Sequence, residues 1–293
     1  MPLRQTKKRT KHKGGSKTRF RILKCSPINS DSKAFSDTCY TAHELLKLAR
    51  KWNSRHPDNP ISLSLPLPTI WENLKQRFIS ICDNEKCWLK QLNEEQLTEI
   101  FSPDSPESWK RTPNEWLSNI DIEKVIKQYE AKYKCFKFIG PVPIDFDLKI
   151  NGSCVESQMC NFNLQQEINQ RKFKFGIIFN TDPHDKSGEH WISLFINLRK
   201  KFIYFFDSAG TPIPPQIMAF VTRVQQQALS LAKPLTLTFD QNTKQHQHGG
   251  TECGVYSLFF IIHMLEDKTT TNYYRKEKLT DNFIQRFRKV YFN

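Results

Sequence analysis

The stretch TECGVYSLFFIIHML, residues 251–265, decides the fold of this chain, because nearly every residue after Gly254 is apolar. A helix over this stretch would be hydrophobic on all sides and therefore buried. Gly249 and Gly250 end the loop before it, so Cys253 is expected at or just before the first helical turn. Unpaired backbone N–H groups and the positive end of the helix dipole would then point at its sulfur and favour the thiolate. Taken alone, the stretch also fits a small cysteine buried in a core.

The composition indicates a globular protein with a substantial core. The 293 residues suffice for one large domain, or for one domain and a smaller one, and 22 Phe and 6 Trp supply apolar volume. No apolar run approaches the ~20 residues that a membrane-spanning helix needs, and the basic N-terminus lacks the apolar segment of a secretory signal. The 8 cysteines are irregularly spaced, so we expect mostly reduced thiols in an intracellular compartment.

The net charge of +14 is concentrated at one end of the chain. Residues 1–24 hold 10 Lys and Arg and no acidic residue, which leaves +4 for the other 269 residues. The body is therefore not a strongly basic nucleic-acid-binding domain. The tail could bind nucleic acid, an acidic protein surface or a localisation receptor, or it could be only a solvated leader.

Composition and periodicity divide the chain into three parts. Residues 1–35 are basic and then rich in serine, which predicts a disordered leader. Residues 36–112 combine apolar helical stripes with proline-rich segments and predict a helical arm. Residues 113–293 mix strand and helix patterns and predict the main domain, of α+β class. The stripes of the arm predict helices over residues 41–52, 70–81 and 86–101.

The main domain is expected to contain a β-hairpin. Two apolar runs are joined by the short charged turn at residues 199–201. We expect strands over residues 173–180, 190–197, 202–207 and 235–239, an extended segment over 136–147, and helices over 122–133, 214–229, 251–265 and 281–291. Residues 149–170 are polar and have no assignment.

The hairpin would place a base beside an acid. His190 begins its first strand and Asp207 ends its second, so the two side chains are neighbours, and a carboxylate beside an imidazole fixes its tautomer and supports its charged form. A Cys253 thiol beside that imidazole would be a strong nucleophile. Gln247, six residues earlier, and the Cys253 backbone N–H could stabilise an oxyanion. Taken alone, His190 also fits a polar strand end, Asp207 a turn, and Gln247 a solvated loop.

Three segments carry a family resemblance: GEHWISLFIN from residue 188, YFFDSAGT from residue 204 and QHGGTECGVY from residue 247. Over residues 113–265 the chain resembles the adenovirus-type and SUMO-deconjugating cysteine proteases. It is most similar to the processing proteases of large cytoplasmic DNA viruses, of the African swine fever virus type. The resemblance implies a papain-like cysteine protease core of mixed sheet and flanking helices. It also implies the catalytic roles: Cys253 as nucleophile, His190 as base, Asp207 as orienter and Gln247 as oxyanion donor.

The same resemblance implies a substrate. The segment from Trp116 to Asn119 is similar to the Trp-Leu-x-Asp/Asn element that lines the substrate groove, and Trp191 would pack beside the site. Such enzymes cut viral structural polyproteins at Gly-Gly-X-like sites during virion maturation, which places this one in the virion and at assembly sites in the host cytoplasm. A groove narrowed by Trp side chains favours glycine, because a Cβ atom would clash.

Two other functions remain open. A deconjugase of SUMO or ubiquitin-like modifiers would also recognise Gly-Gly, and an inactive protein could dock through its basic tail. No cofactor or metal is expected, because none of three candidate pairs has the two-residue Cys spacing of structural zinc sites. These pairs are Cys82 with Cys87, Cys154 with Cys160, and His246 with His248. Gly14-Gly15 in the leader is a candidate for self-cleavage, although a chance Gly-Gly pair in a tail would look the same.

Overall fold

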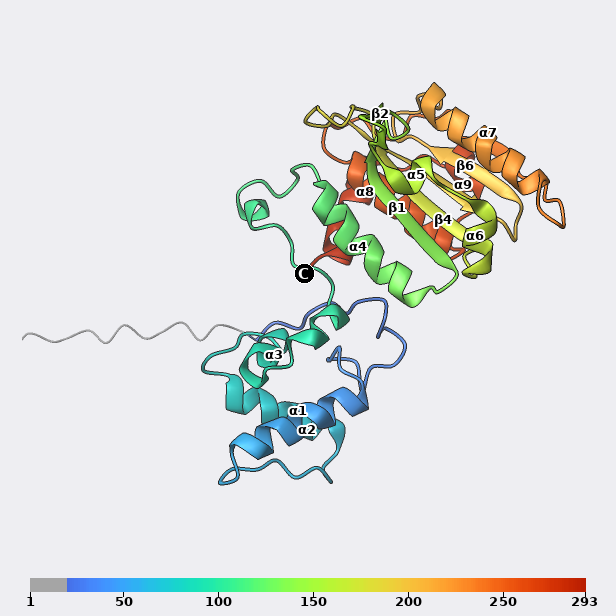
Figure 1. Cartoon of the computed structure of the whole chain (residues 1–293). Helices are drawn as coiled ribbons and strands as arrows, with labels where there is room; N and C mark the ends of the chain where they lie inside the picture. The colour runs from blue at the N-terminus through green and yellow to red at the C-terminus, as the bar shows by residue number, and fades with distance from the viewer. Residues whose placement is uncertain (1–19) are drawn as a thin grey trace, which may run out of the picture. The chain divides into compact units, whose positions relative to one another are not determined.

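The computed structural model describes residues 20–293, which form two compact units (Figure 1). The long continuous part of the main unit runs from Glu99 to Asn293, whereas the sequence suggested a boundary at 113. Most of the basic leader, with the Gly14-Gly15 pair, lies outside the described residues. The smaller unit holds residues 20–23, Ala34–Thr38 and Ala42–Thr98, and the main unit holds Lys24–Lys33, Cys39–Thr41 and Glu99–Asn293.

The smaller unit is helical, as the arm was expected to be. It contains α1 (Ala42–Arg55), α2 (Leu67–Phe78) and α3 (Lys86–Leu92), and η1 (Glu95–Ile100) follows. The expected third helix is interrupted because Asn93 ends α3 in the left-handed conformation, with φ of 54°, which Asn tolerates better than most residues. The buried side chains of the smaller unit include Leu45, Leu48, Trp52, Ile70, Trp71, Leu74, Phe78 and Trp88.

Disulfide bonds among the described residues correct the expectation of mostly reduced thiols. Cys135 and Cys253 are free. Irregular spacing carries no information about which cysteines meet after folding, so the sequence could not reveal the pairs. The bonded pairs are Cys25–Cys39, Cys82–Cys87 and Cys154–Cys160.

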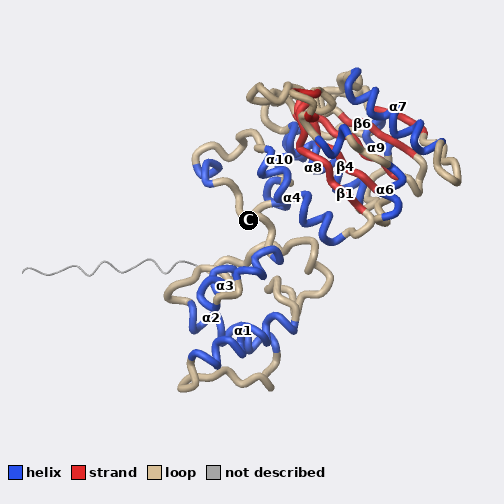
Figure 2. The backbone as a smooth tube through the Cα atoms, in the orientation of Figure 1, coloured by secondary structure: helices blue, strands red, loops and turns tan. Residues whose placement is uncertain are grey.

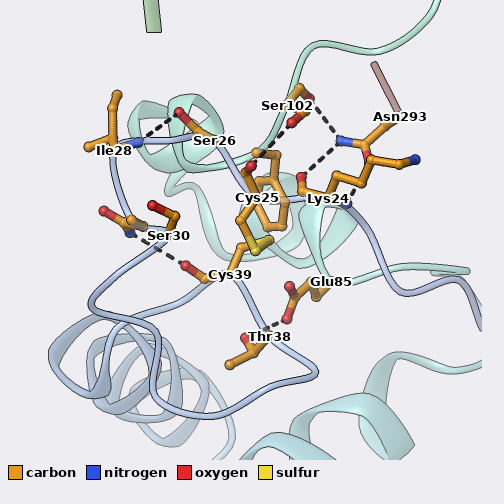
Figure 3. Close-up of a disulfide and its surroundings, with 12 residues drawn as sticks. Lys24, Cys25, Ser26, Ile28, Ser30, Thr38, Cys39, Glu85, Ser102 and Asn293 are labelled. Carbon is orange, nitrogen blue, oxygen red and sulfur yellow. Dashed lines mark hydrogen bonds between the residues drawn. A yellow bond between two sulfur atoms is a disulfide. The ribbon is translucent and has the colours of Figure 1, made fainter. Parts of the chain in front are cut away.

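Residues Lys24–Lys33 belong to the main unit, although the sequence placed them in the disordered leader. The Cys25–Cys39 disulfide holds this segment (Figure 3). The Lys24 backbone N–H donates to Asn293 Oδ1 at 2.6 Å, and Asn293 Nδ2 donates to the Ser102 carbonyl at 2.8 Å. This segment is therefore tied to the end of the chain.

The main unit is built on a mixed five-stranded sheet, which confirms the α+β class (Figure 2). The outer pairs, β1 with β4 and β6 with β7, are parallel, and the inner pairs, β4 with β5 and β5 with β6, are antiparallel. The β5–β6 pair is the expected hairpin. The strands in sheet order are β1 (Phe136–Pro143), β4 (Lys174–Asn180), β5 (Trp191–Asn197), β6 (Phe202–Phe206) and β7 (Thr238–Gln241).

Helices cover both faces of this sheet (Figure 1). Side chains alternate along β5, so Trp191 and Phe195 pack in the cluster with α4 and α8, while Ile192 and Leu194 pack with α7. All residues of α8 except His263 are buried, as its apolar sequence predicts. The bounds are α4 (Asn119–Lys132), α8 (Cys253–Leu265) and α7 (Pro215–Leu229).

The unassigned region and the chain end contain short elements. The expected helix over residues 281–291 is two short helices, α10 (Asp281–Gln285) and α11 (Arg288–Tyr291). Among the helices of residues 20–293, none combines the length and apolar character that crossing a membrane requires. The other elements are η2 (Glu107–Lys110), β2 (Lys149–Ile150), β3 (Ser153–Cys154), α5 (Ser157–Cys160), α6 (Leu164–Asn169) and α9 (Thr271–Lys276).

Candidate active site

The hairpin brings His190 and Asp207 together. His190 directly precedes β5 and Asp207 directly follows β6, and β5 and β6 are antiparallel neighbours. His190 Nε2 lies 2.6 Å from Asp207 Oδ1. Asp207 is buried and His190 is mostly covered, so the pair is shielded from bulk water.

The Asp207 carboxylate is held by the turn that follows it. The backbone N–H groups of Ala209 and Thr211 donate to its two oxygens at 2.9 and 3.1 Å. Asn242 fixes the Asp207 backbone from the other side, because its Oδ1 accepts from the Asp207 N–H at 2.9 Å and its Nδ2 donates to the Asp207 carbonyl at 2.7 Å. The carboxylate therefore has one orientation, aimed at His190.

Cys253 is the first residue of α8, where the helix dipole favours negative charge on its side chain. Its thiol is close enough to the His190 side chain to help raise the pKa of that imidazole. Because Asp207 occupies Nε2, Nδ1 is the ring nitrogen left for the thiol. Sulfur, imidazole and carboxylate thus form one chain from three distant parts of the sequence.

The electrostatics favour a charged imidazole. Burial alone would lower the pKa of His190, but its hydrogen bonds to Asp207 and Cys253 and the negative charges of these two side chains outweigh burial and raise that pKa from 6.5 to about 10. Burial also works to raise the pKa of Asp207, but the hydrogen bond and charge of His190 and the turn N–H groups hold it below its usual value. Each partner stabilises the ionised form of the other.

Gln247 is buried beside Asp207 in the loop before α8. The Ser208 hydroxyl donates to its Oε1 at 2.7 Å, and its Nε2 donates to the Gly249 carbonyl at 2.8 Å. These bonds fix the plane of the amide. One of its two N–H groups is used in this way, and the second remains as a possible donor to an oxyanion. The Cys253 backbone N–H, at the helix start, is the other expected donor.

Gly254, the residue after the predicted nucleophile, is a point of close approach. A Cβ atom on Gly254 would lie 3.0 Å from Leu117 Cβ and 3.2 Å from Trp191 Cδ1. The Trp191 indole N–H donates to the Leu117 carbonyl at 3.0 Å, which fixes the ring against this segment. Trp191 therefore lies beside the start of α8, as the sequence led us to expect.

Two cavities meet at Trp116, which is 40% exposed. A cavity of about 550 Å³ is lined by Trp116, Asn119 and Trp191, the three residues predicted to bind substrate. A second cavity, of about 510 Å³, is lined by Trp116 together with His190, Asp207 and Gln247. The three predicted substrate-binding side chains thus line the first cavity, three of the four predicted catalytic side chains line the second, and Trp116 lines both.

Sequence reasoning missed two residues of this site. Ser208 orients the Gln247 amide, and Asn242 brackets the Asp207 backbone. Ser208 could have been found, because it lies in the DSAG segment that carried the resemblance. Asn242 offered no signal, because its role depends on β7 bringing it beside β6, 35 residues away along the chain.

Comparisons with known proteins point to cysteine proteases. Residues 162–293 match the model of the Ulp1 protease family, C-terminal catalytic domain, a range that includes all four predicted catalytic residues. A protein of Acanthamoeba polyphaga mimivirus that is named as a thiol protease is 27% identical over 298 residues, which is 92% of this chain and 92% of its own. An African swine fever virus protein named SUMO-1 cysteine protease is 28% identical over 182 residues, which is 59% of this chain and 66% of its own.

The fold has a solved counterpart. The crystal structure of an African swine fever virus protease matches 94% of this chain and 98% of its own, with a TM-score of 0.62 and 21% identity. The likeness extends over the N-terminal helices as well as the mixed sheet, so it shows a shared fold for nearly the whole chain.

Proposed function

Because the chain is a cysteine protease that carries a Ulp1-family catalytic domain, we propose that it is an endopeptidase of viral structural polyproteins. It cleaves at Gly-Gly-X-like sites during virion maturation. The observation that carries this proposal is the convergence of Cys253, His190 and Asp207 beside a cavity that Trp116 lines.

The reaction follows from the geometry. The Cys253 sulfur attacks the carbonyl carbon of the scissile bond, and the Gln247 amide and the Cys253 N–H stabilise the oxyanion. As the C–N bond breaks, the His190 imidazolium gives its proton to the leaving amine. The thioester is then hydrolysed by a water molecule whose proton His190 takes, and Asp207 holds the ring throughout.

The preference for glycine next to the scissile bond is supported by the cleft. Trp116 is shared by the two cavities, so a bound peptide passes it on the way from one to the other. Trp191 and Leu117 pack tightly against the residue next to the nucleophile. Such surroundings favour residues without a Cβ atom, because any side chain there would meet an indole or a leucine.

Cleavage profiling tests this proposal. A peptide library incubated with wild type and with Cys253→Ala should yield cuts after Gly in Gly-Gly-X peptides with wild type alone. Cuts by wild type that show no preference for small residues would overturn the proposed specificity, while leaving the cysteine protease assignment intact.

A deconjugase of SUMO-like modifiers is the second candidate. It is favoured by the name of the African swine fever virus relative, SUMO-1 cysteine protease. Both substrate classes present Gly-Gly, so a preference for glycine does not separate them. The two are separated by comparing kcat/KM for a SUMO fusion and for a Gly-Gly-X peptide of a structural precursor. A fusion cleaved orders of magnitude faster would favour the deconjugase.

Residence in the virion and at assembly sites in the host cytoplasm is part of the same proposal. Ten basic residues within the first 24 could hold the enzyme on nucleic acid or on an acidic surface in a particle. The inactive alternative, docking by the tail alone, is disfavoured by the family match. Immunogold labelling of purified particles tests the location, and its absence from them would contradict it.

A further inference from the structure

Arg288 is a buried charge outside the predicted catalytic set. It begins α11 and is only 4% exposed. Its Nη2 donates to the Thr251 carbonyl at 3.1 Å and, at 3.5 Å, to the Asn114 carbonyl. The guanidinium lies 4.8 Å from the centre of the Trp109 ring. One side chain thus joins the end of the chain, the loop before the nucleophile and the segment before Trp116.

Arg288 also begins a series of hydrogen bonds through Gln285 to Glu252, which we call the relay. Arg288 Nε donates to Gln285 Oε1 at 2.6 Å, and Gln285 Nε2 donates to Glu252 Oε1 at 2.7 Å. The Glu252 carboxylate also accepts from the Thr251 backbone N–H at 3.0 Å and is itself buried. Guanidinium, amide and carboxylate are therefore connected in series. The oxygen of the Gln285 amide accepts from Arg288, and its nitrogen donates to Glu252.

The relay ends at the peptide that precedes the nucleophile. Glu252 is the residue before Cys253 and caps the start of α8, with a right-handed helical φ of −93° and ψ of −13°. The hydrogen bonds to the Thr251 carbonyl and to the Glu252 side chain hold this residue on both sides. They therefore fix the direction of the Cys253 N–H, which the proposed mechanism uses as an oxyanion donor.

Burying the charges of Arg288 and Glu252 costs more folding free energy than an ordinary packing contact would. Buried charges lose hydration, and an apolar pair of similar volume usually stabilises a fold as well or better. Burial lowers the pKa of Arg288, and the charge of Glu252 opposes that change. One Arg288 nitrogen, Nη1, is buried with no hydrogen-bond partner. The buried Arg288 side chain is therefore better explained by a role in orienting its neighbours than by a role in stabilising the fold.

We propose that Gln285 and Arg288 are positioning residues of the active site, which act through Glu252 and Thr251 to aim the Cys253 N–H at the oxyanion. Neither touches the substrate. The proposal rests on the proposed function, since it assigns these residues a part in peptide-bond cleavage. Substitutions that break the relay should lower kcat with little change in KM, because the oxyanion that the Cys253 N–H stabilises forms only in the transition state.

A polarity swap tests the relay. Gln285→Glu sets two carboxylates against each other, and we expect kcat to fall by about 10–100-fold, as small displacements of reacting groups do. The double variant Glu252→Gln with Gln285→Glu restores an amide-to-carboxylate bond with reversed direction, and should return most of the lost kcat. Gln285→Ala is a second variant, at a partly exposed position, and should lose kcat to a similar degree while folding normally.

The control is Arg286→Lys, on the same segment but exposed, which should match wild type in kcat and KM. All variants are assayed on both a Gly-Gly-X peptide and a SUMO fusion. If wild type cleaves only one of these, the substrate proposal is decided, and the relay is tested on the substrate that is cleaved. Thermal unfolding of each variant is measured in parallel.

Recovery of kcat in the double variant, with KM steady throughout, supports the relay. It is overturned if Gln285→Glu and Gln285→Ala retain wild-type kcat. It is also overturned if the double variant is no faster than Gln285→Glu, or if the losses follow only the melting temperature.

Discussion

His190 Nε2 lies 2.6 Å from Asp207 Oδ1, although 17 residues separate them along the chain. The antiparallel pairing of β5 and β6 produces this contact, and two backbone N–H groups of the following turn hold the carboxylate in place. The predicted base is therefore oriented by the two ends of a hairpin and by the turn that follows it.

The pH dependence of activity should follow the His190–Asp207 contact. The pKa of His190 is raised from 6.5 to about 10, so the imidazolium persists through neutral pH. The alkaline limb of kcat/KM should lie near pH 10 in wild type. Asp207→Asn removes a cause of the rise, so its alkaline limb should move toward pH 6.5, with a lower maximum. An unchanged limb would contradict the role of Asp207.

The free energy of unfolding should also depend on pH through the raised pKa of His190. A raised pKa in the folded state means that the contribution of His190 is complete below pH 6.5 and declines as pH rises toward about 10. The difference in free energy of unfolding between wild type and His190→Ala should therefore shrink over this range. Urea unfolding at pH 6 and at pH 10 measures it, and a difference that grows with pH would be inconsistent with the pair.

Gln247→Ala should lower kcat by about 10²–10³-fold, the usual cost of losing one oxyanion donor. The backbone around residue 247 is held by other bonds, including those from the His246 and Gln247 N–H groups to the Ser208 carbonyl. The fold should survive, as thermal unfolding would verify. A neutral effect on kcat would assign the donor role to Gln245 or to backbone groups alone.

Gly254→Ala should impair the enzyme although the new side chain is small. Its Cβ atom would press on Leu117 and Trp191 at 3.0 and 3.2 Å, and overpacking of this kind costs about 1–3 kcal/mol. We expect reduced stability and a shift in Trp fluorescence as the Trp191 ring moves. Gly250→Ala, where nothing lies within 4 Å of the added atom, is the matched control.

Asn242→Ala should weaken catalysis without touching any catalytic side chain. It leaves the buried N–H and carbonyl of Asp207 without their side-chain partner, at a cost of about 1–3 kcal/mol for each unsatisfied group. The Asp207 carboxylate loses its fixed direction, so kcat should fall together with the melting temperature. Full activity in a destabilised Asn242→Ala would show that the turn alone orients Asp207.

Local patterns were enough to predict much of this site. The two apolar runs around residues 199–201 set the hairpin, and its ends placed His190 beside Asp207. The apolar stretch of α8 placed Cys253 at a helix start. These predictions succeeded because each depends on hydrogen bonding between neighbours in sequence, where strand alternation and helix length leave few alternatives.

The remainder depends on contacts that no local pattern encodes. Asn242 meets Asp207 through the β6–β7 pairing, and Glu252 meets Gln285 only after the end of the chain folds back. Cys25 and Cys39 meet because their segment packs in the main unit. The break at Asn93 was missed because helical periodicity continues on both sides of it.

Labelling with a Gly-Gly peptide that carries a thiol-reactive group at its C-terminus tests the central claim most directly. Intact mass and peptide mapping report which cysteine reacts, and Cys135 serves as the internal control because it is also a free thiol. We predict one label, on Cys253, in wild type, and a loss of labelling in His190→Ala that is still folded. A label on Cys135, or equal labelling of Cys253 with and without His190, would contradict the account.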